Sequence, residues 1–214
     1  MRLPAALLFT LAVAAPAAAQ PREPIAPFVV DVRGAFGRHK AEPSVATELG
    51  VTAANLPTRT LGLAAGVHLY PLRSGKVTLG LGGNMVITRG SKALDVVAGT
   101  SGETQKGPSV DRHFTTFSPE ISLNFGSRNG WSYISGGMFG RSTLYLDRAD
   151  DPASSAPYRK TVNYGGGARW FTRDHLAVSV DFRWYSVAEQ LASSGAIAQP
   201  GTTLLILSGG IAIR

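Results

Sequence analysis

The sequence predicts an all-β protein, an eight-stranded antiparallel up-and-down transmembrane β-barrel, and three observations carry this prediction. Segments with a two-residue hydrophobic period recur along the chain, and that period gives a strand one apolar and one polar face. The segments are even in number, and long polar connections alternate with tight turns between them. The faces opposite the apolar ones are rich in glycine and small polar residues, which suits a narrow lumen better than a water-facing surface.

The expected strands follow one another in chain order, and each is long enough for the ~9–11 residues that a tilted strand needs to cross hydrocarbon. They cover residues 27–38, 58–70, 76–88, 113–125, 131–146, 161–171, 176–188 and 202–213. The seventh has the strictest pattern, because every second residue from Leu176 to Trp184 is apolar. The fifth has no consistently polar face, so its orientation stays open.

The connections between these strands differ in length at the two ends of the barrel. Long polar loops are expected at residues 39–57, 89–112, 147–160 and 189–201. Tight turns are expected at 71–75, 126–130 and 172–175. No segment between the strands has a helical period. In an outer-membrane barrel the short turns are periplasmic, so we expect both termini on the periplasmic side.

The apolar strand faces are expected to meet lipid, because in hydrocarbon only a closed barrel satisfies every backbone group. The clearest members of these faces are Phe28, Val30, Val32, Phe36, Leu61, Leu63, Val67, Leu69, Leu81, Met85, Ile87, Ile121, Leu123, Leu207, Ile211 and Ile213. Aromatic residues gather near the strand ends and predict two interfacial belts. They are Phe28, Tyr70, Phe125, Trp131, Tyr133, Trp170 and Phe171 at the turn end, and Phe36, Phe114, Phe117, Tyr145, Tyr164, Trp184 and Tyr185 at the loop end.

Six charged residues fall on the inward faces and predict a charge network in the lumen. They are Asp31, Arg33, Glu120, Arg169, Asp181 and Arg183. Three cations and three carboxylates in one low-dielectric space are expected to pair, because an unpaired charge there is costly. His68 is expected to form hydrogen bonds in the lumen, near the periplasmic end.

The first twenty residues have the pattern of a secretory signal peptide: a basic residue, a short apolar run and small residues before a cleavage point. We therefore expect a leader at 1–20 and a barrel domain at 21–214. The chain has no cysteine, which excludes disulfides, thiolate metal sites and thiol nucleophiles.

The stretch YGGGARWFTRDHLAVSVDFRWYS, residues 164–186, resembles a hairpin of the OmpA-like family of eight-stranded outer-membrane β-barrels. The likeness lies in a glycine-rich strand ending in Arg-aromatic-aromatic, a short turn with Asp, and an alternating strand ending in Arg-aromatic-Tyr. The resemblance extends to the layout of the whole chain after the leader. It implies a protein of the cell outer membrane that meets membrane lipids and the barrel-assembly machinery. The chain departs from the family at Arg214, where a terminal aromatic is common.

The net charge of +7 points to anionic neighbours, and export makes nucleic acid an unexpected partner. Basic residues lie near the loop ends of the strands, and we expect them to pair with lipopolysaccharide phosphates through charge-assisted bonds. These candidates are Arg38, Lys40, Arg59, Arg89, Arg112, Arg159 and Lys160. The alternative is that they are ordinary loop charges offset by nearby carboxylates.

The sequence favours a structural or surface-interaction role through the long loops, with no enzymatic activity, no cofactor and no metal. The four histidines, His39, His68, His113 and His175, lack a metal-ligand spacing such as HxxxH. One alternative is a narrow channel for small solutes. Another is a lipid-modifying enzyme, because His113-Phe114-Thr115 is similar to the His-x-Ser pair of lipid A deacylases, with Thr in the Ser position. A soluble periplasmic ligand-binding barrel is a further alternative, which the loop asymmetry disfavours.

Overall fold

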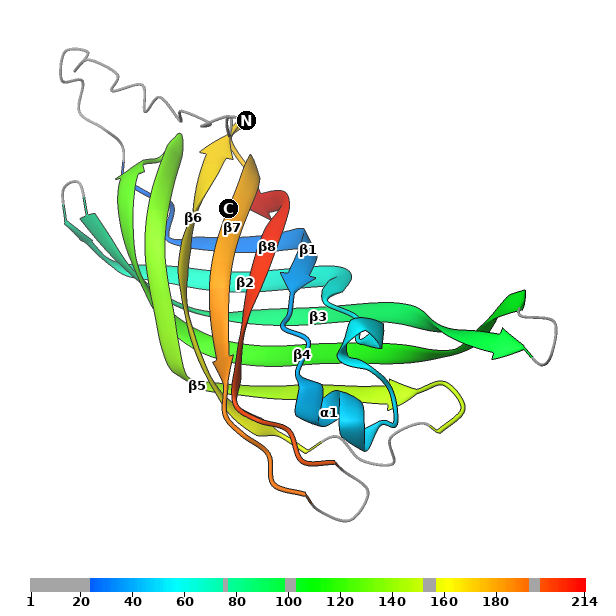
Figure 1. The fold of residues 1–214 in the computed structure, drawn as a ribbon. Helices are drawn as coiled ribbons and strands as arrows, with labels where there is room; N and C mark the ends of the chain where they lie inside the picture. Colours follow the sequence, from blue (N-terminus) through cyan, green and yellow to red (C-terminus); the bar gives the residue numbers. More distant parts are fainter. Residues whose placement is uncertain (1–23, 75–76, 99–102, 152–156, 193–196) are drawn as a thin grey trace, which may run out of the picture.

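The structure, a computed structural model, describes residues 24–74, 77–98, 103–151, 157–192 and 197–214. The expected leader at 1–20 lies outside this range. Eight antiparallel strands form a closed barrel in which each pairs with the next and the last pairs with the first (Figure 1). The strands are β1 (Phe28–Arg38), β2 (Arg59–Ser74), β3 (Val77–Ala98), β4 (Glu103–Ser127), β5 (Gly130–Arg148), β6 (Arg159–Phe171), β7 (Leu176–Val187) and β8 (Thr202–Ile213). The predicted fold class is confirmed.

The register of the ladders determines which face of each strand points outward. Val30 lies opposite Val67 on β2 and Ile213 on β8, so apolar residues are neighbours all along this seam. A slip of one residue would turn these side chains into the lumen, so the hydrophobic pattern specifies the register. Most of the apolar side chains expected to face outward are exposed, as at Leu63 (64%) and Val32 (52%), while Phe36 is half-buried. We call this exposed surface the apolar belt.

No helix in the described part of the chain is long and apolar enough to cross a bilayer.

The connection expected at residues 89–112 is mostly strand, so this prediction was wrong. The β3–β4 ladder continues past Arg89↔His113 as far as Ala98↔Glu103, and the pair extends well beyond its neighbours (Figure 1). The sequence of this segment lacks the two-residue apolar period of the other strands, because beyond the apolar belt neither face needs a continuous apolar row. Backbone pairing between two long neighbouring strands is enough to continue the ladder.

The first connection contains a short helix, α1 (Pro43–Glu48), and a 3₁₀ turn, η1 (Ala53–Asn55), which the sequence analysis missed. Six residues are too few to establish a helical period. The helix ends in a Schellman motif at Gly50 (φ 66°), in which the Gly50 amide donates to Thr47 O and the Val51 amide to Ala46 O. We call residues 39–58 the loop-1 cap. Its apolar side chains pack against the extended strands, in a cluster that includes Val45, Ala46, Leu56, Leu94, Val110 and Leu146.

Candidate functional site

The barrel interior consists of three levels, with apolar layers at both ends and charges between them. The turn-end layer contains Ile25, Val29, Tyr70, Trp131, Tyr133, Ala177 and Ala212. The loop-end layer contains Ala35, Ala64, Val86, Phe114, Leu144, Tyr185, Val187, Leu204 and Ile206. Along β1 the inward residues run from Val29 through Asp31 and Arg33 to Ala35, so one strand crosses all three levels.

These layers correct the prediction of two aromatic belts. Five of the expected belt residues are buried inside the barrel, namely Tyr70, Trp131, Tyr133, Phe114 and Tyr185. Their positions near the strand ends were assigned correctly, but their parity along the strands turns them inward. Others remain outside, including Tyr164 and Trp184, whose rings stack with centroids 5.6 Å apart. Aromatic side chains therefore fill both ends of the lumen as well as covering part of its exterior.

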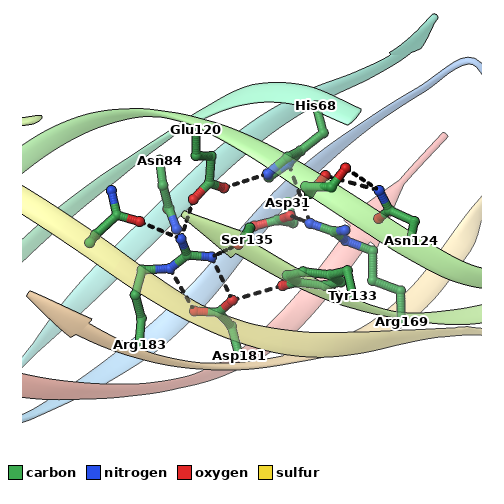
Figure 2. A network of polar contacts seen from close by, with 12 residues as sticks. Asp31, His68, Asn84, Glu120, Asn124, Tyr133, Ser135, Arg169, Asp181 and Arg183 are labelled. Carbon is green, nitrogen blue, oxygen red and sulfur yellow. Dashed lines mark hydrogen bonds and ion pairs between the residues drawn. The ribbon is translucent and has the colours of Figure 1, made fainter. Parts of the chain in front are cut away.

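All six predicted lumenal charges lie in the middle level, within one connected network. Figure 2 labels five of them, Asp31, Glu120, Arg169, Asp181 and Arg183. Asp31 forms an ion pair with Arg33, whose Nε lies 2.8 Å from Oδ1, and accepts a hydrogen bond from Arg169 Nη2 on Oδ2 at 2.6 Å. Asp181 pairs with Arg183 Nη2 at 3.0 Å and lies 3.5 Å from Arg33 Nη1. Arg183 also pairs with Glu120. Each carboxylate thus has at least one guanidinium partner.

Neutral side chains complete this network, and most of them were not singled out from the sequence. Tyr133 Oη donates to Asp181 at 2.9 Å, and Arg183 donates to Asn163 Oδ1 at 2.6 Å and Ser135 Oγ at 2.7 Å. Arg33 donates to Asn84 Oδ1 at 3.1 Å. Inward parity is the sequence signal that could have identified them.

His68 lies in the same level, where a lumenal hydrogen bond was expected. Its Nε2 is 2.6 Å from Glu120 Oε1, and the side chain is 2% exposed. Arg169 lies over the Tyr133 ring, 4.6 Å from its centroid, and donates to Tyr70 Oη at 3.2 Å. These contacts join the charge network to the turn-end layer.

Polar contacts also link the loop-1 cap to the loop end of the lumen. His39 Nε2 lies 3.0 Å from Thr60 Oγ1, which in turn donates to Thr88 Oγ1. Burial, and to a lesser extent the charge of Arg112, lowers the pKa of His39 to about 3. The ring is therefore neutral at neutral pH and adds no charge to the mouth of the barrel.

The seven basic lipopolysaccharide candidates separate into exposed and buried residues. Arg38, Lys40, Arg59 and Lys160 are exposed, and Arg89 is exposed while paired with Asp111 at 2.6 Å. Arg112 and Arg159 are buried, at 3% and 4% exposure, so the prediction that these two contact lipopolysaccharide at the surface was wrong. Arg112 donates to Lys40 O, and Arg159 donates to Ala188 O, Gln199 Oε1 and Pro200 O. Both side chains occupy inward-facing positions of their strands, and this explains why they are buried while the other five are exposed.

His113 lies outside the lumenal network, near the loop end. Its ring stacks on Tyr145 with centroids 4.7 Å apart, and its Nε2 is 3.7 Å from Asp147. Asp111, His113 and Asp147 bring three possible ligand atoms within 4.8 Å of one another. Arg89 already supplies a cation to Asp111 there. The Arg89 guanidinium therefore already balances one carboxylate charge of this cluster.

Several solved structures resemble this chain. Ail of Yersinia pestis, in complex with the heparin analogue sucrose octasulfate, is 13% identical with a TM-score of 0.47, over 86% of this chain and 97% of that one. Neisserial surface protein A is 9% identical with a TM-score of 0.48, over 88% and 97%. OprG from Pseudomonas aeruginosa is 10% identical with a TM-score of 0.48, over 90% and 97%.

No protein-family model and no curated protein matches the chain. The OmpA-like resemblance of residues 164–186 therefore stays an expectation.

Proposed function

We propose that this chain is an outer-membrane β-barrel with a sealed lumen, which has a structural or surface-interaction role through its loop end. The observation that carries the proposal is the three-level interior, in which two apolar layers enclose a paired charge network. The loop end then faces the cell exterior, and both termini face the periplasm. Membrane lipids, lipopolysaccharide and the barrel-assembly machinery are the partners proposed with it.

The apolar belt supports insertion in a membrane. Large hydrophobic side chains are exposed on all eight strands, as at Leu61 (69%), Ile121 (57%) and Ile134 (58%). A soluble monomer rarely exposes contiguous apolar patches larger than a few hundred Å², on the order of 300–600 Å² at most. Inside the barrel the chain instead buries the three arginines and three carboxylates of the charge network. This inverted distribution is stable when hydrocarbon surrounds the barrel.

The filled interior argues against the alternative of a narrow channel. A solute would have to displace aromatic side chains such as Tyr70 and Trp131 in one layer, and Phe114 and Tyr185 in the other. Between the layers it would have to separate ion pairs such as Arg169–Asp31. Water-excluded pairs of this kind are costly to break. The loop-1 cap lies beyond the loop-end layer and adds a further obstruction.

Recordings in a planar lipid bilayer test the sealed lumen. The purified barrel is expected to give no steady conductance steps at neutral pH, because all three levels are filled. A porin reconstituted in the same way serves as the positive control. Steady conductance steps that scale with the amount of inserted barrel would instead favour the channel.

The proposal includes no catalytic role. The side chains near His113 are the stacked Tyr145 ring and the carboxylates Asp111 and Asp147, with Arg89 on Asp111. In the pattern that resembles lipid A deacylases, Thr115 stands where a serine nucleophile is usual. The ion-pair and stacking contacts account for this cluster without a reaction.

A further inference from the structure

Three successive rows of outward side chains cross β2, β1, β8 and β7, as their registers define. The glycine row is Leu63, Gly34, Gly209 and Val180. The middle row is Leu61, Phe36, Leu207 and Phe182. The cation row, nearest the loop end, is Arg59, Arg38, Leu205 and Trp184. Arg38 and Arg59 therefore lie side by side on the loop-end side of an apolar surface.

A hollow opens in the apolar belt across the two lower rows. Its volume is about 610 Å³, and its walls are the large side chains Phe36, Leu61, Phe182 and Leu207. Its floor is formed by Gly34 and Gly209, which lie opposite each other. A Cβ atom at either glycine would meet its nearest neighbour, a backbone oxygen, at 3.8 Å. The hollow exists because these two positions have no side chain, and the backbone leaves room for one at both.

A second hollow lies directly toward the loop end and is lined by basic and aromatic residues. Arg38, Lys40, Tyr164, Trp184 and Leu205 contribute to it, and its volume is about 790 Å³. The two hollows adjoin, because Phe182 lines the lower one and Trp184 the upper one, with ring centroids 5.6 Å apart. This outer face is therefore apolar toward the middle of the barrel and cationic toward its loop end.

The cation row carries positive charge without a counter-charge. Arg38 and Arg59 are register partners on neighbouring strands, and both are exposed. Within the described residues, neither of them nor Lys40 forms an ion pair. Like charges directly opposite each other on a sheet repel. An anion between the two guanidinium groups would relieve this repulsion and accept bidentate hydrogen bonds.

We propose that this outer face of β2, β1, β8 and β7 binds a lipid with a phosphorylated headgroup. The phosphate pairs with Arg38 and Arg59, and one acyl chain lies in the hollow over Gly34 and Gly209. Charge complementarity selects the occupant, because a second copy of this chain would bring the same cations to the same place. The inference rests on the proposed membrane location and narrows the wider set of basic candidates to one site.

Native mass spectrometry of the full barrel in detergent micelles, with synthetic diphosphoryl lipid A as the probe, tests this site. Arg38→Gln with Arg59→Gln is expected to weaken binding about tenfold or more, since it removes both charge-assisted contacts. Gly34→Leu with Gly209→Leu fills the hollow and is expected to weaken binding about tenfold while keeping both cations. Gly209→Leu alone serves if the double variant does not fold. Inorganic phosphate in excess is expected not to displace the lipid.

Matched controls make the result specific to this face. Arg141 on β5 and Arg173 in the turn between β6 and β7 are exposed cations outside the candidate set, so Arg141→Gln with Arg173→Gln removes the same charge elsewhere. Ala65→Leu adds bulk to the apolar belt outside the hollow. Both are expected to change lipid affinity less than about twofold. Equal losses from the two cation pairs, or unchanged binding with the filled hollow, would overturn the site.

A gel of unboiled and boiled samples separates failure of this site from failure of the proposed function. A barrel that migrates as a folded species but binds lipid equally in all variants overturns only the lipid site. A chain that is recovered as a soluble protein and forms no membrane barrel overturns both proposals.

Discussion

Replacement of Arg183 by methionine is expected to lower the free energy of unfolding by about 3–5 kcal/mol, because it leaves buried carboxylates without their partner. Arg183 is 1% exposed and pairs with both Glu120 and Asp181. It also donates to Asn163 and Ser135, so its loss leaves two further polar groups without a donor. Urea unfolding of the barrel in lipid vesicles, followed by tryptophan fluorescence, measures the change.

The matched control is Arg173→Met, in the exposed turn between β6 and β7. It makes the same chemical change outside the network and is expected to alter the free energy of unfolding by less than about 0.5 kcal/mol. Arg183→Met combined with Glu120→Gln is expected to recover part of the loss, because one unpaired charge is removed. Equal effects of Arg183→Met and Arg173→Met would contradict a tightly paired lumen.

Replacement of Leu63 by arginine is expected to destabilise the barrel by about 2–4 kcal/mol, the cost of a cation facing lipid near the bilayer midplane. Leu63 on β2 is 64% exposed in the apolar belt. It belongs to the glycine row, which crosses β1 at Gly34 and β7 at Val180, near the middle of both strands. In a soluble barrel the same substitution would place a charge in water at almost no cost. Vesicle-based urea unfolding compares the variant with the parent chain.

Leu191→Arg is the control for this prediction. Leu191 is even more exposed, at 79%, but lies in the connection after β7, outside the strands. Its replacement is expected to change stability by less than about 0.5 kcal/mol. If Leu63→Arg is as neutral as Leu191→Arg, the exposed apolar face meets water, and a soluble ligand-binding barrel becomes the better interpretation.

The sequence predicts the barrel well because alternation is a local property of each strand. Asp31 and Asp181 belong to the first and seventh strands, yet parity alone assigns both to the interior, where they lie close to Arg33. The inward position of Tyr133 differs from the predicted interfacial one, because the fifth strand has no consistently polar face from which its direction follows. Its inward direction follows from the ladder with β6, where it lies opposite Gly167.

Features that depend on distant segments could not be predicted in this way. The six-residue helix α1 is held by Leu94, Val110 and Leu146, which lie on three different strands. The extension of β3 and β4 depends on each strand having the other as its partner beyond the belt. Arg159 is basic and close to a loop, yet its donors are satisfied by carbonyls and an amide of the connection before β8. Charge and position alone do not reveal such partners.

The electrophoretic mobility of the chain in the outer-membrane fraction, before and after boiling in dodecyl sulfate, tests the central claim most directly. A closed barrel whose apolar belt faces lipid is expected to be recovered in that fraction, to stay folded without boiling, and to shift in mobility only after boiling. Recovery as a soluble periplasmic protein, with the same mobility in both samples, would contradict the membrane barrel and the assignment of its outer face to lipid.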